Sequence, residues 1–132
     1  MPLTRINPST MYRNPAYTQV VRVPAGYETI YVGGQNGIGR DGSIVGPGLA
    51  EQTRQAVTNL RACLDAAGAS PSDVVKLTIL CVEGAPLHEG FAAFGEAWQA
   101  DSAAPAITVA FFAGLAVPGA LVEIEAVAAI PT

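Results

Sequence analysis

Two carboxylates near the C-terminus are the clearest candidates in this chain for residues that take part in chemistry. Residues 121–130 read LVEIEAVAAI, which places Glu123 and Glu125 two positions apart in a run of β-branched and small apolar residues. In a strand, alternate side chains face opposite ways, so both carboxylates share one face and Val122 and Ile124 share the other. An ionised carboxylate shut away from water is costly unless it is paired. The face with the glutamates is therefore a solvated surface, a seam between subunits or a working cleft.

The other residues that often do chemistry are isolated in the sequence. Cys63 and Cys81 have no second Cys or His near them at ligand spacing, so we interpret both as buried small hydrophobes in a reducing compartment. His88 is the one histidine, and no metal-ligand spacing surrounds it. We expect no metal site.

A glycine motif at residues 37–42, GIGRDG, matches the GxGxxG pattern of dinucleotide-binding proteins. That fingerprint needs its glycines to open a helix whose N-terminus holds the pyrophosphate. Here SIVGPG intervenes before any helix can begin, and Asp41-Gly42 is a turn pair. We therefore do not expect a nucleotide site.

Length and composition indicate one domain over residues 1–132 that buries surface in an assembly. The chain has 132 residues, of which 50% are hydrophobic and only 14% are charged. A soluble chain usually has about a quarter charged residues. The surplus apolar surface predicts oligomer interfaces.

Charge and hydropathy exclude two classes of partner. The net charge is −4 and the seven basic residues are scattered, so no stripe could follow nucleic-acid phosphates. No apolar run approaches the roughly 18 residues of a membrane span. The N-terminal MPLTRINPST lacks the apolar stretch of a signal peptide. We expect a cytoplasmic protein that binds neither nucleic acid nor membrane.

The elements that must position the glutamates follow from hydrophobic periodicity. In the N-terminal half, a β-hairpin is expected to pair residues 17–23 with 27–34. A short strand arm at 43–45 follows, and then an amphipathic helix over 49–67 that ends at Gly68.

The second half of the chain alternates strands with a second helix. We expect a capped turn at 70–73, a strand at 74–82, a helix at 86–99 and two closing strands, AITVAFFA and LVEIEAVAAI. The helix carries a stripe that is expected in the core: Leu87, Phe91, Phe94 and Trp98. This order predicts an α+β fold with one mixed sheet and two helices on one face.

Residue runs along nearly the whole chain resemble the Rid family of reactive intermediate deaminases, also called YjgF-like proteins. The matching runs are Asn7-Pro8, residues 16–19, 30–35 and 73–79, the helix with Gln52, Asn59 and Leu60, residues 104–109 and residues 122–126. Their order and spacing carry the resemblance. It implies a chorismate-mutase-like fold, a homotrimer and three small-molecule clefts between subunits. It also implies hydrolysis of enamines and imines to oxo acids and ammonia without a cofactor.

Most polar site residues of the deaminating relatives are replaced in this chain. The resemblance places Ile107 where they have an Arg that binds the substrate carboxylate, and Gly33 where they have a Ser. Gly95 is the counterpart of an Asn on the second helix. Two site residues remain: Tyr17, and Glu123, which in such relatives orients or activates the attacking water.

The loss of the Arg predicts a changed ligand preference. A charge-assisted hydrogen bond contributes roughly 1.5–3 kcal/mol, so its loss weakens carboxylate binding about ten- to a hundredfold. We therefore expect poor activity on 2-imino acids and a neutral or more apolar ligand, with Ile107, Phe111 and Tyr17 as walls. Arg13, four residues before Tyr17, is an alternative source of positive charge, although a surface arginine is the default interpretation.

Three functions remain open from the sequence. The first is an enzyme that hydrolyses an imine, enamine or related labile molecule with Glu123 and water. The second is a trimer that binds a small ligand at its subunit interfaces without catalysis. The third is a protein-interaction or chaperone-like role through exposed apolar surface.

Overall fold

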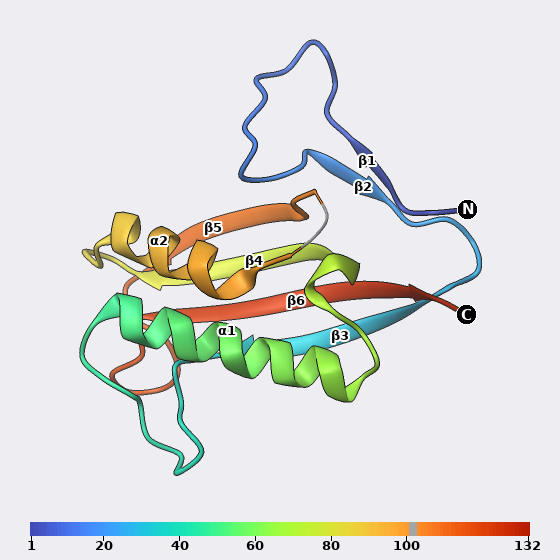
Figure 1. Cartoon of the computed structure of the whole chain (residues 1–132). Helices are drawn as coiled ribbons and strands as arrows, with labels where there is room; N and C mark the ends of the chain where they lie inside the picture. Colours follow the sequence, from blue (N-terminus) through green and yellow to red (C-terminus); the bar gives the residue numbers. More distant parts are fainter. Residues whose placement is uncertain (101–102) are drawn as a thin grey trace.

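The computed structural model describes residues 1–100 and 103–132, which fold into a four-stranded sheet, two helices and a short two-stranded arm. The elements are β1 (Thr4–Ile6), β2 (Val20–Arg22), β3 (Tyr27–Gln35), α1 (Leu49–Ala66), a 3-10 turn (Pro71–Asp73), β4 (Val74–Val82), α2 (Leu87–Trp98), β5 (Ala106–Phe112) and β6 (Val122–Pro131). The main sheet has the order β3-β6-β4-β5, with β4 and β5 parallel and the other pairs antiparallel. Both helices lie on one face of this sheet (Figure 1). The mixed α+β architecture is confirmed.

The elements after residue 48 form close to where periodicity predicts them. Strand β4 has the expected bounds, and each helix differs from its expected bounds by one residue at one or both ends. Gly68 adopts a φ of +79° just beyond α1, the left-handed conformation in which glycine commonly ends a helix. The Ser70 backbone N–H donates to the Asp73 carboxylate at 2.9 Å, which caps the expected turn.

The expected hairpin between residues 17–23 and 27–34 is wrong. Only Val20–Arg22 is strand, and it pairs with β1, whereas β3 pairs with β6. Thr18 explains the difference, because its backbone N–H donates to the Pro105 carbonyl at 2.9 Å and its hydroxyl to the Ala104 carbonyl. These bonds hold the N-terminal segment beside the start of β5, at the sheet edge opposite β3.

The glycine motif at residues 37–42 lies in a short loop. Ile38 and Ile44 form an isolated antiparallel bridge, which is the short arm expected at 43–45. Gly42 has a φ of +87° within the turn. The motif does not open a helix, so the structure supports no pyrophosphate site there.

The core lies between the helices and one face of the sheet. Leu60 and Leu64 of α1 and Leu77 of β4 are all fully buried in it. Along β6 the alternate residues Val122, Ile124, Ala126 and Ala128 are buried in it. Glu123 and Glu125 alternate with them and therefore face away from the helices, as the sequence pattern predicted.

Candidate functional site

The N-terminal segment, α2 and strands β4 and β5 border a cavity of about 620 Å³ that is partly open to solvent. Its lining residues are Asn14, Ala16, Tyr17, Ile79, Phe91, Phe94, Gly95, Ile107 and Val109. Three of the residues predicted for a ligand site, Tyr17, Gly95 and Ile107, are thus brought together from three distant parts of the chain. We call this space the apolar cavity.

Local hydrogen bonds and strand register place these residues. The bonds from Thr18 to Ala104 and Pro105 set Tyr17 close to the start of β5. Ile107 pairs with Leu77 in the parallel register, and neighbours in register project from the same face of a sheet. Because Leu77 is buried against the helices, Ile107 also faces the helix side and enters the cavity.

The lining of the apolar cavity is almost free of polar groups. Among the residues that the structure describes, those lining it include no acidic or basic side chain. Its polar side chains are Tyr17 and Asn14, and the Asn14 Oδ1 already accepts the backbone N–H of Ala16 at 2.9 Å. Aromatic and branched aliphatic side chains form the other walls. This surface favours an uncharged or weakly hydrated group.

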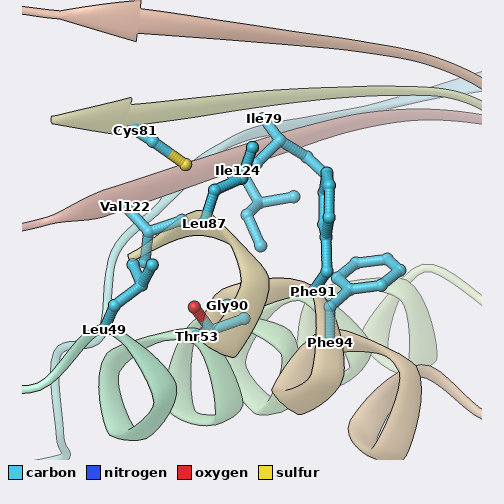
Figure 2. Close-up of a pocket in the computed structure, with 10 residues that line it drawn as sticks. All are labelled: Leu49, Thr53, Ile79, Cys81, Leu87, Gly90, Phe91, Phe94, Val122 and Ile124. Atoms are coloured by element: carbon cyan, nitrogen blue, oxygen red, sulfur yellow. The ribbon is translucent and has the colours of Figure 1, made fainter. Parts of the chain in front are cut away.

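A second, much smaller cavity of about 10 Å³ lies deeper, between the two helices and the sheet (Figure 2). It shares Ile79, Phe91 and Phe94 with the apolar cavity, so these side chains lie between the two spaces. The Thr53 Oγ1 lines it and has no hydrogen-bond partner among the described residues. Its volume is about that of a single water molecule.

Glu123 occupies a different site, beside a bulge in β3. Between the pairs Val32–Ala126 and Gln35–Ile124, β3 has one more residue than β6, which is the definition of a β-bulge. The Glu123 carboxylate lies over this bulge: a Cβ atom added to Gly34 would be 2.2 Å from its Oε2. Residue 34 must therefore lack a side chain for Glu123 to keep this position.

Asn36, just after β3, fixes the carboxylate and is itself held by amide side chains of α1. The Asn36 Nδ2 donates to Glu123 Oε1 at 3.3 Å and to the Val122 carbonyl at 3.0 Å. The Asn59 Nδ2 donates to the Asn36 carbonyl at 3.1 Å, and Gln55 donates to the Asn59 Oδ1 at 2.9 Å. Since Asn36 is buried, Glu123 is held by a chain of amides that is anchored in the core.

The predicted site residues therefore fall into two groups on opposite faces of the sheet. Tyr17, Gly95 and Ile107 lie on the helix side, whereas Glu123 points to the open face. Gly33 also lies at the open face, where it lines a hollow of about 300 Å³ that includes Glu125. A single chain does not bring the carboxylate to the apolar cavity.

Two further predicted residues are placed outside the lining of the apolar cavity. Phe111 lies two residues beyond Val109 on β5 and is 47% exposed. Arg13 is exposed and precedes the lining residue Asn14. Their proposed contacts with a ligand stay predictions.

Sequence reasoning missed several residues of these sites, among them Phe91, Gly34 and Asn36. Phe91 was expected in the core with Phe94 but is 48% exposed at the apolar cavity, because the helical stripe is wider than the core that it covers. Gly34 and Asn36 support Glu123 from a separate strand and loop. The GGQN run at residues 33–36 gave one usable signal, since paired glycines in a strand often mark a bulge.

The expectation that both cysteines are buried holds for Cys81, whereas Cys63 is only half-buried. Both are free, and Cys81 is buried, where loss of hydration raises the pKa of its thiol above the ordinary 9.0. Among residues 1–100 and 103–132 there is no group of three or more His, Cys, Asp or Glu side chains that could hold a metal ion. No helix in the same ranges is long and apolar enough to span a membrane.

Comparison with known proteins identifies the family. Residues 9–130 match the model of the family described as endoribonuclease L-PSP, Ribonuc_L-PSP. The chain belongs to this family, which includes the Rid and YjgF-like proteins. A Rid-family protein of unknown function from Yersinia pestis, YyfB, has a similar structure with a TM-score of 0.84 and 32% identity, covering 98% of this chain and all of that one.

Named relatives in the family include 2-iminobutanoate/2-iminopropanoate deaminases. The goat (Capra hircus) protein of that name is 36% identical over 115 residues, which cover 85% of this chain and 78% of the goat protein. The rat (Rattus norvegicus) protein is 44% identical over 69 residues, covering 52% of this chain and 48% of the rat protein. The match therefore spans about half the length of the rat relative.

Proposed function

We propose that this protein is a homotrimer that hydrolyses imines or enamines in clefts between its subunits, with Glu123 as the catalytic carboxylate. The observation that carries the proposal is the separation of the two site halves. The apolar cavity lies on the helix face, and Glu123 lies on the open face of the same sheet. A second copy can present its Glu123 to the cavity of the first, and cyclic symmetry then repeats this contact at every interface.

The open face of the sheet supports assembly. Tyr31 is 81% exposed and Phe112 is 44% exposed on the two edge strands, β3 and β5. Between them, Leu80 and Val127 also point away from the helices and are only half-buried. A sheet with an apolar face normally buries it against another layer. In the proposed trimer, other subunits cover this face.

The amide chain suits Glu123 to activate water. The Asn36 side chain donates a hydrogen bond to Oε1 of the carboxylate, so Oε2 is the oxygen that accepts a proton from a water molecule. The water oxygen bonds to the imine carbon, the C=N electron pair moves to nitrogen, and a carbinolamine forms. Glu123 returns its proton to nitrogen to complete the carbinolamine. The hydroxyl proton then passes to nitrogen as the C–N bond breaks and the C=O bond forms, which gives a carbonyl compound and ammonia. Positioned acid-base groups of this kind contribute roughly 10²–10⁴-fold in rate.

The relatives named as 2-iminobutanoate/2-iminopropanoate deaminases support imine chemistry for this chain. Their substrates carry a carboxylate, however, and Ile107 offers that group no hydrogen bond. We therefore propose that this chain is an inefficient deaminase of 2-imino acids. The scattered basic residues and the net charge of −4 argue against RNA as the substrate.

A non-catalytic ligand-binding trimer is the second candidate. The apolar lining favours it, because among the described lining residues only the side chains of Tyr17 and Asn14 offer hydrogen bonds to direct a ligand. In this case the cavity binds an apolar metabolite and Glu123 is a structural carboxylate held by Asn36.

The experiment that tests these candidates is ammonia release from imines generated in situ, with wild-type protein and Glu123→Gln. An enzyme speeds release, and the variant loses at least a hundredfold in rate with little loss of affinity. A binding trimer gives no acceleration with any imine. Glutamine keeps the shape of the side chain and the bond from Asn36, so a change in folding does not imitate loss of catalysis.

A further inference from the structure

We infer that the ligand of the composite cleft is a small organic cation with an apolar body, and specifically the iminium form of a carboxylate-free imine. This inference rests on the proposed function, because it joins the apolar cavity of one subunit to Glu123 of another. It goes further by naming the substrate class from the charges present.

The charged groups of the joined site favour a cationic ligand. The described lining residues of the apolar cavity carry no formal charge, and Glu123 with its amide partners carries one negative charge. None of the described residues that line the apolar cavity offers a cation to a carboxylate on the ligand, and a carboxylate close to Glu123 in a partly dry cleft would be repelled. A cation at the same point forms a favourable pair with Glu123.

The walls of the apolar cavity suit a cation with an apolar body. Tyr17, Phe91 and Phe94 place three aromatic rings on the cavity, and the faces of aromatic rings attract cations. Ile79, Ile107 and Val109 add aliphatic surface on the sheet side. The volume of about 620 Å³ leaves room for a phenyl or branched alkyl substituent. The apolar cavity can therefore accommodate both the cationic group and the apolar body of the ligand.

An iminium ligand in this cleft is also the form that reacts with water. A protonated imine is the electrophilic form, and its reaction balances as R₂C=NH₂⁺ + H₂O → R₂C=O + NH₄⁺. Water forms the C–O bond while Glu123 accepts one of its protons and then passes that proton to nitrogen. As the C–N bond breaks, Glu123 accepts the remaining hydroxyl proton, the C=O bond forms, and the departing ammonia takes up this proton as NH₄⁺. Glu123 therefore both attracts the cationic substrate and takes part in its hydrolysis. Imines of this class arise when amines, not amino acids, are oxidised.

Binding of three matched probes tests the charge preference directly. We expect wild-type protein to bind benzylammonium about ten- to a hundredfold more tightly than benzoate, with benzyl alcohol between them, by titration calorimetry. Glu123→Gln is expected to remove most of the preference for benzylammonium over benzyl alcohol. Benzoate binding as tight as benzylammonium, or an unchanged preference in Glu123→Gln, would overturn the inference.

Substitutions at residue 107 give a gain-of-function test with a matched control. Ile107→Arg places a guanidinium in the cavity and is expected to reverse the order in favour of benzoate, whereas Ile107→Met keeps it. Arg13→Ala is expected to leave all three affinities unchanged. If Arg13→Ala instead abolishes benzoate binding that wild type shows strongly, Arg13 supplies the positive charge and the inference is wrong.

A catalytic comparison separates this inference from the proposed function. Hydrolysis of an N–H phenyl ketimine, followed by release of the ketone, is compared with ammonia release from 2-imino acids. Faster reaction of the ketimine supports both ideas. Faster reaction of the 2-imino acids overturns the substrate class but supports the proposed function. Preference for benzylammonium without hydrolysis of either substrate supports the ligand class and contradicts the enzyme.

Discussion

At the scale of single residues, the two glycines of the β3 bulge differ sharply in what they tolerate. An added Cβ at Gly34 would lie 2.2 Å from Glu123 Oε2, whereas nothing lies within 4 Å of one at Gly33. Neither glycine has a positive φ, so alanine can adopt both backbone conformations. A side chain at residue 34 would therefore displace the Glu123 carboxylate without straining the backbone of the bulge.

Gly34→Ala is expected to displace Glu123 from Asn36. We predict at least a tenfold loss of rate, because misplacing a reacting group is costly, and a fall of roughly 0.5–1.5 kcal/mol in the free energy of unfolding from the lost hydrogen bond. Urea unfolding and the imine assay measure the two effects. Gly33→Ala is the matched control and should keep both values near wild type. Equal behaviour of the two variants would contradict the placement of Glu123.

Residue alternation predicted which way Glu123 faces but not what holds it. Alternation is local to β6, and the buried positions Val122 and Ile124 make it unambiguous. Asn36 and Gly34 come from a segment more than eighty residues earlier, so their contacts depend on the pairing of β3 with β6. No pattern within one strand contains that information.

At the scale of elements, α2 carries two glycines in different surroundings. A Cβ at Gly90 would be 2.8 Å from the Leu49 Cδ2, because the helices approach closely there, whereas one at Gly95 meets open space in the apolar cavity. Glycine lowers helix stability by roughly 1 kcal/mol relative to alanine. At position 90, close packing between the helices compensates for this loss of helix stability. At position 95, the absence of a side chain leaves space for a ligand.

Replacing these glycines should therefore change stability in opposite directions. We predict that Gly95→Ala raises the free energy of unfolding by roughly 0.5–1 kcal/mol. Gly90→Ala should lower it by roughly 1–3 kcal/mol through overpacking against Leu49. Chemical denaturation of both variants checks this. Stabilisation by Gly90→Ala would show that the helices are less tightly packed than the structure indicates.

Strand β4 carries a titratable group inside the core. Burial raises the pKa of the Cys81 thiol above 9.0, so the folded state retains a proton that the unfolded state loses at high pH. This contribution to stability is fully present below pH 9.0 and is lost as pH rises through the folded-state pKa. We predict a steeper loss of stability above pH 9 in wild type than in Cys81→Ala, measured as urea midpoints between pH 7 and about 10.5. Parallel pH profiles would contradict this.

Helices and central strands were predictable because their periodicity is local, whereas the N-terminal pairing was not. The turn signal at Pro24-Ala-Gly26 favours a hairpin, yet β3 joins the ten-residue β6. The long apolar face of β6 is a better partner than three residues of β2. Which strand pairs with β3 depends on competition between a neighbouring strand and a distant one. Patterns within a single sequence do not show which of the two pairings is more stable.

At the scale of the whole molecule, the composition and the open sheet face indicate the same arrangement. A chain with 14% charged residues leaves Tyr31 and Phe112 exposed on the face opposite its helices. The proposed trimer buries this face and joins each apolar cavity to a neighbouring Glu123. We expect the protein to sediment at about three times the 13.5 kDa of the chain.

Mixing two inactive variants tests whether each cleft is shared. Gly95→Trp fills the apolar cavity, and Glu123→Gln removes the carboxylate, so each variant alone is expected to be inactive. In trimers formed by joint refolding of equal amounts, about one quarter of clefts combine an intact cavity from one subunit with an intact Glu123 from another. The mixture should therefore recover about a quarter of the wild-type rate of ketimine hydrolysis. Cavities and carboxylates that act within one chain would recover nothing, because no chain in the mixture has both.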